Sequence, residues 1–207
     1  MADCGCKGPQ KTFEGMSPAY KRRLWMVIAI NGLMFFVEMT AGQLSGSQAL
    51  QADALDFLGD TLTYGISLAA IGASIAVRSN AAIFKAVTLF LMGLWVAGST
   101  LWRVFFIITP TAEIMGAVGF LALAANLSSV LLLVKYKDGD ANVRSVWLCS
   151  RNDAIGNVAV MIAALGVWGT ATGWPDLIVA AIMAGLFLNS AWLIIRQALA
   201  ERRAISD

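Results

Sequence analysis

Histidine is absent from this 207-residue sequence, and charged residues make up only 14% of it. The absence of histidine excludes a Ser-His nucleophile pair and the histidine motif of zinc proteases. The three cysteines, Cys4, Cys6 and Cys149, are too few for a disulfide framework. A net charge of +2 does not provide the strongly basic face that nucleic-acid binding needs. We therefore expect neither an enzyme nor a nucleic-acid-binding protein.

Apolar residues dominate what is present. They make up 58% of the chain, and the mean hydropathy is +0.72. This composition is typical of an integral membrane protein in contact with the lipid bilayer. A window of about 20 residues finds six apolar segments, which predict an all-α fold of six transmembrane helices. The expected spans are residues 24–44, 49–77, 81–107, 113–135, 145–169 and 176–198.

Basic residues indicate how the helices are oriented. They lie before the first span, around the second and fourth connections and after the last span, whereas the first, third and fifth connections contain none. Because cytoplasmic loops are enriched in Lys and Arg, both termini are predicted to be cytoplasmic. We expect an N-terminal tail at 1–23 with no signal peptide, a transmembrane domain at 24–200 and a short C-terminal tail at 201–207. The short loops favour a bacterial inner membrane.

Carboxylates interrupt the second apolar segment in the stretch QADALDFLGD. Asp53, Asp56 and Asp60 are three and four residues apart, so they share one helix face. Cys149, Asp153 and Asn157 form a similar stripe on the fifth span. A charge at bilayer depth costs at least about 2.5–3.5 kcal/mol, so each of these groups needs a partner or a function.

The two polar stripes predict a cation site if the second and fifth helices touch. Asp56, Asp60, Asp153 and Cys149 would then surround one point, with Asn152, Asn157 and Asp53 as possible accessory groups. Three oxygen ligands and a thiolate suit Zn²⁺, with Cd²⁺, Co²⁺ or Fe²⁺ as alternatives. Crowded carboxyl groups that hold protons without a cation would release them when one binds.

Other interpretations of these residues stay open. A single aspartate can pair with an arginine such as Arg103 or Arg151, and this applies most to Asp53. Cys149 alone is equally consistent with a small buried apolar residue. In the N-terminal tail, Cys4 and Cys6 are one residue apart and could capture a soft metal ion, although two ligands do not close a zinc site.

Several motifs, in this order and spacing, resemble the cation diffusion facilitator family. In the first span, Asn31, Glu38 and Gly42 have the spacing of that family's first helix. The stretch Gly46-Ser-Gln-Ala-Leu-Gln-Ala-Asp53-Ala is similar to the start of its second helix. Two metal motifs follow, Asp56-Phe-Leu-Gly-Asp60 and Cys149-Ser-Arg-Asn-Asp153, and then Trp174-Pro-Asp176 precedes the sixth span.

The resemblance implies a homodimeric antiporter that exports a divalent metal in exchange for protons. By position, Asp56, Asp60 and Asp153 are metal ligands, and Cys149 stands where the family usually has histidine or aspartate. Many members continue into a cytoplasmic domain, so a short form would form its dimer through membrane helices or tails. The small-residue runs 65–72 and 93–98 would allow close helix approach.

The sequence thus predicts a zinc/proton antiporter that works by alternating access. The metal is the transported substrate, and no permanently bound cofactor is expected. One alternative is a membrane sensor or partner subunit that binds metal without transporting it. Flux measurements discriminate between the two, as does the dependence of metal binding on Cys4 and Cys6.

Overall fold

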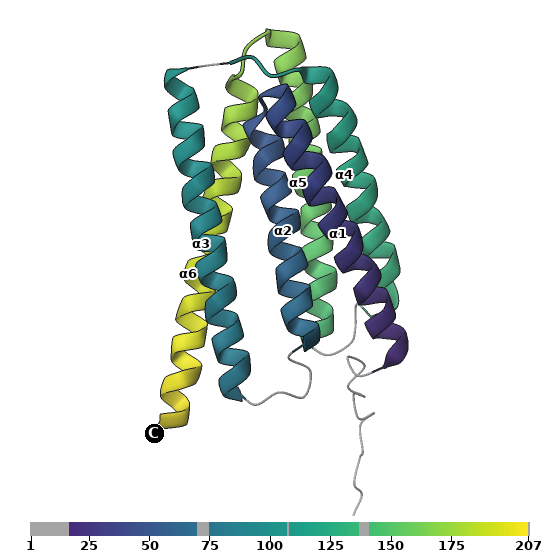
Figure 1. The fold of residues 1–207 in the computed structure, drawn as a ribbon, viewed down its shortest axis with the longest axis vertical. Coiled ribbons are helices and arrows are strands. Elements are labelled where there is room, and N and C mark those ends of the chain that lie inside the picture. The colour runs from purple at the N-terminus through teal and green to yellow at the C-terminus, as the bar shows by residue number, and fades with distance from the viewer. Residues whose placement is uncertain (1–16, 70–74, 107, 137–140, 207) are drawn as a thin grey trace, which may run out of the picture.

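The computed structural model describes residues 17–69, 75–106, 108–136 and 141–206, without the side chains of 67, 75–79, 81, 141–149 and 197–206. The described part is all-α (Figure 1). Its long helices are α1 (Pro18–Ser45), α2 (Gln48–Ala69), α3 (Ile75–Phe105), α4 (Ala112–Leu133), α5 (Ala141–Thr170) and α6 (Trp174–Ser206), and a 3₁₀ turn, η2 (Val134–Tyr136), follows α4.

The helix ends follow local capping rules. Ser17 caps α1, because its side chain accepts a hydrogen bond from the Tyr20 amide at 3.2 Å, and Pro18 takes the first helical position. α1 ends at Gly46, whose φ of 74° lies in the left-handed region that glycine adopts without strain. Ser47 then caps α2 by accepting from the Leu50 amide at 3.0 Å. The expected break at Gly46 and Ser47 is confirmed.

The helices group by packing. α1 packs mainly against α2, α4 against α5 and α3 against α6, and α1 also packs against α4. Figure 1 shows α3 and α6 side by side at one edge, with α1, α2, α4 and α5 forming the rest of the bundle. The helices therefore form two groups, the α3–α6 pair and the four others. α2 and α5 are the members of the second group that pack against the pair.

The bundle has two distinct ends in Figure 1. The α1–α2, α3–α4 and α5–α6 connections lie at one end, called here the loop end. The start of α1 and the end of α6 lie at the other, called here the terminal end. The start of α1 and the end of α6 thus lie on the same side, and the assignment of that side to the cytoplasm stays a prediction.

Large apolar side chains cover the outside of the helices, among them Leu33, Phe36, Leu131, Leu165 and Trp168. Contiguous apolar surfaces of this kind are typical of lipid contact. Within the described residues, five helices are long and apolar enough to cross a membrane. α2 is not among them because of its three aspartates. Its 22 residues still span about 33 Å, enough for the hydrocarbon core.

Several expected boundaries differ from the structure: α1 begins at Pro18, inside the expected N-terminal tail, and α5 begins at Ala141 and not at residue 145. Residues 75–77 were assigned to the second span but begin α3, and Arg78–Asn80, expected as a connection, lie inside that helix. The apolar run through residue 77 contains no proline, so hydropathy alone does not show where α2 ends. α6 continues to Ser206, through residues expected in the C-terminal tail.

Candidate metal centre

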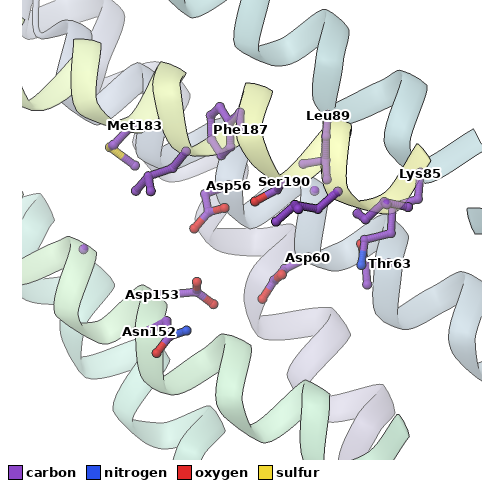
Figure 2. Close-up of a pocket in the computed structure, with 15 residues that line it drawn as sticks. Asp56, Asp60, Thr63, Lys85, Leu89, Asn152, Asp153, Met183, Phe187 and Ser190 are labelled. Atoms are coloured by element: carbon purple, nitrogen blue, oxygen red, sulfur yellow. The ribbon is translucent and has the colours of Figure 1, made fainter. Parts of the chain in front are cut away.

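Three carboxyl groups converge where α2 faces α5. Asp56 and Asp60 are one turn apart on α2, and the side chain of Asp153 on α5 interacts with both. Figure 2 shows all three carboxyl groups turned toward a common space. The predicted meeting of the second and fifth helices is therefore what the structure shows for these residues.

A cavity of about 460 Å³ connects to this space. Asp56, Gly59, Asp60 and Thr63 form its α2 wall, and α3, α5 and α6 form the others. Along α2 the lining extends from Asp56 toward the end of the helix, and along α6 it reaches Ile194. The cavity therefore runs from the carboxyl groups toward the terminal end of the bundle.

Two polar residues support the acidic cluster. The Tyr64 hydroxyl, one turn beyond Asp60, donates a hydrogen bond to the Asp60 carboxylate. Asn126 of α4 lines a small enclosed space together with the three aspartates and Phe57. Neither residue belongs to the site that the sequence predicts. The spacing of four residues could have indicated Tyr64, whereas Asn126 requires knowledge of which helices are neighbours.

The cluster is open in its present arrangement. Within the described side chains, no three acidic or cysteine groups lie close enough together to enclose a metal ion. A bound ion would therefore draw Asp56, Asp60 and Asp153 together or take a further ligand. Asn152 lines the same cavity and lies beside Asp153 in Figure 2, but its amide oxygen accepts a hydrogen bond from Arg151 at 3.4 Å and would have to leave it to bind an ion.

The remaining predicted ligands fall into two groups. The side chain of Cys149 and the whole of Cys4 and Cys6 lie outside the described residues. The backbone of Cys149 does belong to α5, one turn from Asp153 toward the terminal end. Asn157 is fully buried, but it is not among the residues that line the cavity.

Asp53 lies away from the cavity. It is 1% exposed and its carboxyl group interacts with that of Glu38 on α1, which is 0% exposed. The acidic stripe on α2 thus divides, with Asp56 and Asp60 facing the cavity and Asp53 facing α1 nearer the loop end. Arg151 is exposed, is not among the residues that line the cavity, and donates to Asn152 Oδ1 at 3.4 Å.

Lys85 of α3 is a basic residue on the cavity wall. Figure 2 shows it on the side of the pocket away from Asp153, and its charge interacts electrostatically with Asp60. The sequence placed Lys85 beside a connection, as part of the positive charge that orients the protein. In the structure it also provides a positive charge near the acidic cluster.

We expect Lys85→Met to bind Zn²⁺ about 3- to 10-fold more tightly than the wild type. Removing a positive charge near the site lowers the repulsion of a divalent cation, an effect on the order of 1 kcal/mol across a polar cavity. Isothermal titration of the purified protein measures the change. Lys85→Arg keeps the charge and is the control, and weaker binding by Lys85→Met would contradict the electrostatic role.

Comparison with known families identifies the family of this chain. A family model described as the cation efflux transmembrane domain matches residues 24–201. The chain belongs to this family. The cation efflux family is the cation diffusion facilitator family that the motifs resemble, and its match includes every residue of the acidic cluster.

Two bacterial relatives are similar to this chain over most of its length. The chain is 30% identical over 199 residues to the zinc transporter ZitB of Yersinia pestis, covering 87% of this chain and 62% of the relative. It is 28% identical over 195 residues to the metal cation efflux system protein CzcD of Cupriavidus metallidurans, covering 86% and 60%. The chain thus spans about three fifths of the length of the relatives it matches.

These findings also bear on location. Five apolar helices, a transmembrane family domain and bacterial relatives together support a multi-pass protein of the bacterial inner membrane.

Proposed function

We propose that this chain transports a divalent metal cation, with Zn²⁺ as the first candidate, through the cavity that ends at Asp56, Asp60 and Asp153. The observation that carries the proposal is the convergence of these three carboxyl groups, from two helices, at the inner end of a cavity of about 460 Å³. Buried carboxylates are costly unless a cation or protons compensate them. The names of the relatives, a zinc transporter and a metal cation efflux protein, support the same substrate class.

The donor set favours zinc over harder ions if Cys149 contributes its thiolate. The α5 backbone puts Cys149 one turn from Asp153, on the same helix face. Because α2 and α5 run in opposite directions, Cys149 lies on the same side of Asp153 as Asp60 does of Asp56, toward the terminal end. Three carboxylates and one thiolate give the four ligands that zinc takes in proteins. Without the thiolate, the site is entirely oxygen-based and suits a harder ion.

The proposed transport is an exchange for protons by alternating access. With the terminal end cytoplasmic, the cavity admits a cation from the cytoplasm. Binding releases protons from the carboxyl groups, and their return from the other side displaces the metal. The separation of the α3–α6 pair from the other four helices supports a mechanism in which these two groups move relative to each other.

Flux into proteoliposomes tests this proposal. Vesicles that contain the purified protein and a zinc-sensitive dye are expected to accumulate Zn²⁺ at a rate that follows an imposed pH gradient. Flux that ignores the gradient would refute proton exchange and leave transport standing. Binding without flux would refute transport and support a sensor or partner subunit.

We further propose that the protein acts as a homodimer, as the family resemblance implies. Gly65 and Gly98 have no described atom within 4 Å of an added Cβ, so a second copy could approach there. A Cβ added to Gly93, from the same predicted runs, would lie 3.0 Å from Leu188 and 3.2 Å from Phe187 of α6, so the close approach at Gly93 lies within the chain. Cysteine cross-linking at residues 65 and 98 in membranes checks the proposal, and a purely monomeric pattern would contradict it.

A further inference from the structure

A carboxylate from α6 caps the N-terminus of α2. Asp176 Oδ2 accepts a hydrogen bond from the Gln48 amide at 2.8 Å, and Oδ1 accepts from the Ala49 amide at 3.0 Å. The Ser47 hydroxyl donates to Oδ1 at 2.6 Å. The side chain is 2% exposed, so these contacts replace solvent almost completely.

The N-terminus of a helix is normally capped by a residue that directly precedes the helix. The first amides of a helix lack partners within it, and a side chain just before the helix usually accepts from them. Ser47 already accepts from the Leu50 amide in that way. Asp176 lies 127 or more positions further along the chain, so its contacts join two helices as well as stabilising α2.

Two sources supply the positive charge that surrounds the Asp176 carboxylate. The N-terminus of α2 carries the partial positive charge of the helix dipole. Arg103 of α3 also interacts electrostatically with Asp176, and its Nη1 lies 3.7 Å from the position of a Cβ on Gly46. Both members of the α3–α6 pair therefore put charged groups on the α1–α2 connection.

α2 and α6 separate further along, toward the terminal end of the bundle. α2 and α6 are joined at the loop end by Asp176, and Met183, Phe187 and Ser190 of α6 line the cavity opposite Asp56 and Asp60. Between the contact and the cavity, Gln51 and Asp53 are buried, and Ala52 packs against α6 in an apolar cluster. The acidic cluster is thus closed toward the loop end.

We propose that Asp176 is a latch that keeps the loop end closed while the cavity reaches the terminal end, and that it leaves the α2 N-terminus when the site faces the other way. This inference rests on the proposed transport. Asp176 is 116 positions from Asp60 in sequence and is not a metal ligand here; it is a positioning residue that acts through α2. A fixed contact at this end would hold the site toward one side.

A reversible cross-link tests the latch. Ser47→Cys and Asp176→Cys are combined in the full chain, and each single variant is the control for the native cysteines and for loss of the cap. Oxidation of the pair is expected to reduce zinc flux into vesicles at least about 10-fold, while zinc titration shows binding within about 3-fold of the reduced pair. A reducing agent is expected to restore the flux. An oxidised pair that transports at the rate of the reduced pair would overturn the proposal.

Hydrogen–deuterium exchange separates failure of the latch from failure of transport. In the wild type, opening of the latch exposes the amides of Gln48 and Ala49, so the peptide over residues 46–51 is expected to exchange faster than in the oxidised pair. This readout does not depend on flux. If no variant transports zinc but the exchange rates of the wild type and the oxidised pair differ, the proposed transport is refuted and the latch is supported. Equal exchange in the two proteins would overturn the latch.

Discussion

Asp60→Asn is expected to lower the affinity for Zn²⁺ at least about 100-fold and to abolish flux. Asp60 faces the cavity from α2 and its carboxyl group lies within reach of Asp153. The substitution keeps the shape of the side chain and removes its charge. Loss of a group that only orients a metal ligand costs about 10- to 100-fold in affinity, so loss of a ligand costs at least as much. Isothermal titration and vesicle flux on the same preparation measure both effects.

Glu113→Gln is the matched control for this experiment. Glu113 is an exposed acidic residue in the first turn of α4, at the loop end and away from the cavity. It also loses one negative charge, so a general effect of net charge would appear in both variants. Normal zinc binding by Asp60→Asn would contradict the assignment of the acidic cluster as the metal site.

Cys149→Ala, measured alongside, identifies the chemistry of the site. If the thiolate is a ligand, this variant is expected to lose Zn²⁺ and Cd²⁺ affinity as Asp60→Asn does. Unchanged binding would show an oxygen-only site with Asn152 as the additional donor in reach, and Mn²⁺ or Co²⁺ would then be the better substrates to test.

Gly42→Ala is expected to destabilise the protein by about 1–3 kcal/mol, the usual cost of overpacking. An added Cβ would lie 2.8 Å from Gln51 Cγ, 3.0 Å from the backbone nitrogen of Gln51 and 3.2 Å from Leu50 Cβ. The Gln51 side chain also donates to the Gly42 carbonyl at 3.2 Å, and separating α1 from α2 would weaken that bond. The midpoint of denaturant unfolding in detergent gives the change in free energy.

Gly116→Ala in α4 shows whether this loss comes from packing. No described atom lies within 4 Å of a Cβ at that position. Because alanine favours a helix over glycine by about 1 kcal/mol, the control is expected to be neutral or stabilising. A neutral or stabilising effect of Gly42→Ala as well would contradict the tight α1–α2 contact.

The sequence predicted most of the secondary structure and which acidic residues share a helix face, because both depend on local spacing. Glycine at position 46 and serine at position 47 mark a helix boundary through their own conformations. Asp56 and Asp60 are four residues apart and share a helix face whatever surrounds them. The motif order then indicated which other helix contributes Asp153.

The residues of other helices that lie beside a given helix turn were not predictable in the same way. Asp53 belongs to the same acidic stripe but faces Glu38, because α1 packs against α2 at that level. Asn126 and Lys85 enter the site only through the positions of α4 and α3. Asp176 was noticed as part of a motif, and its role in capping α2 requires a contact between residues 128 positions apart.

The two-residue connection between α1 and α2 has a consequence for the assembly of the protein in the membrane. Three aspartates in eight residues make α2 a poor substrate for insertion by itself, since insertion scales assign each at the helix centre about 2.5–3.5 kcal/mol. α1 is apolar enough to partition into lipid, and Gly46 and Ser47 tie α2 directly behind it. The two helices are therefore expected to leave the translocon as one hairpin, so that α1 recruits the helix that carries Asp56 and Asp60.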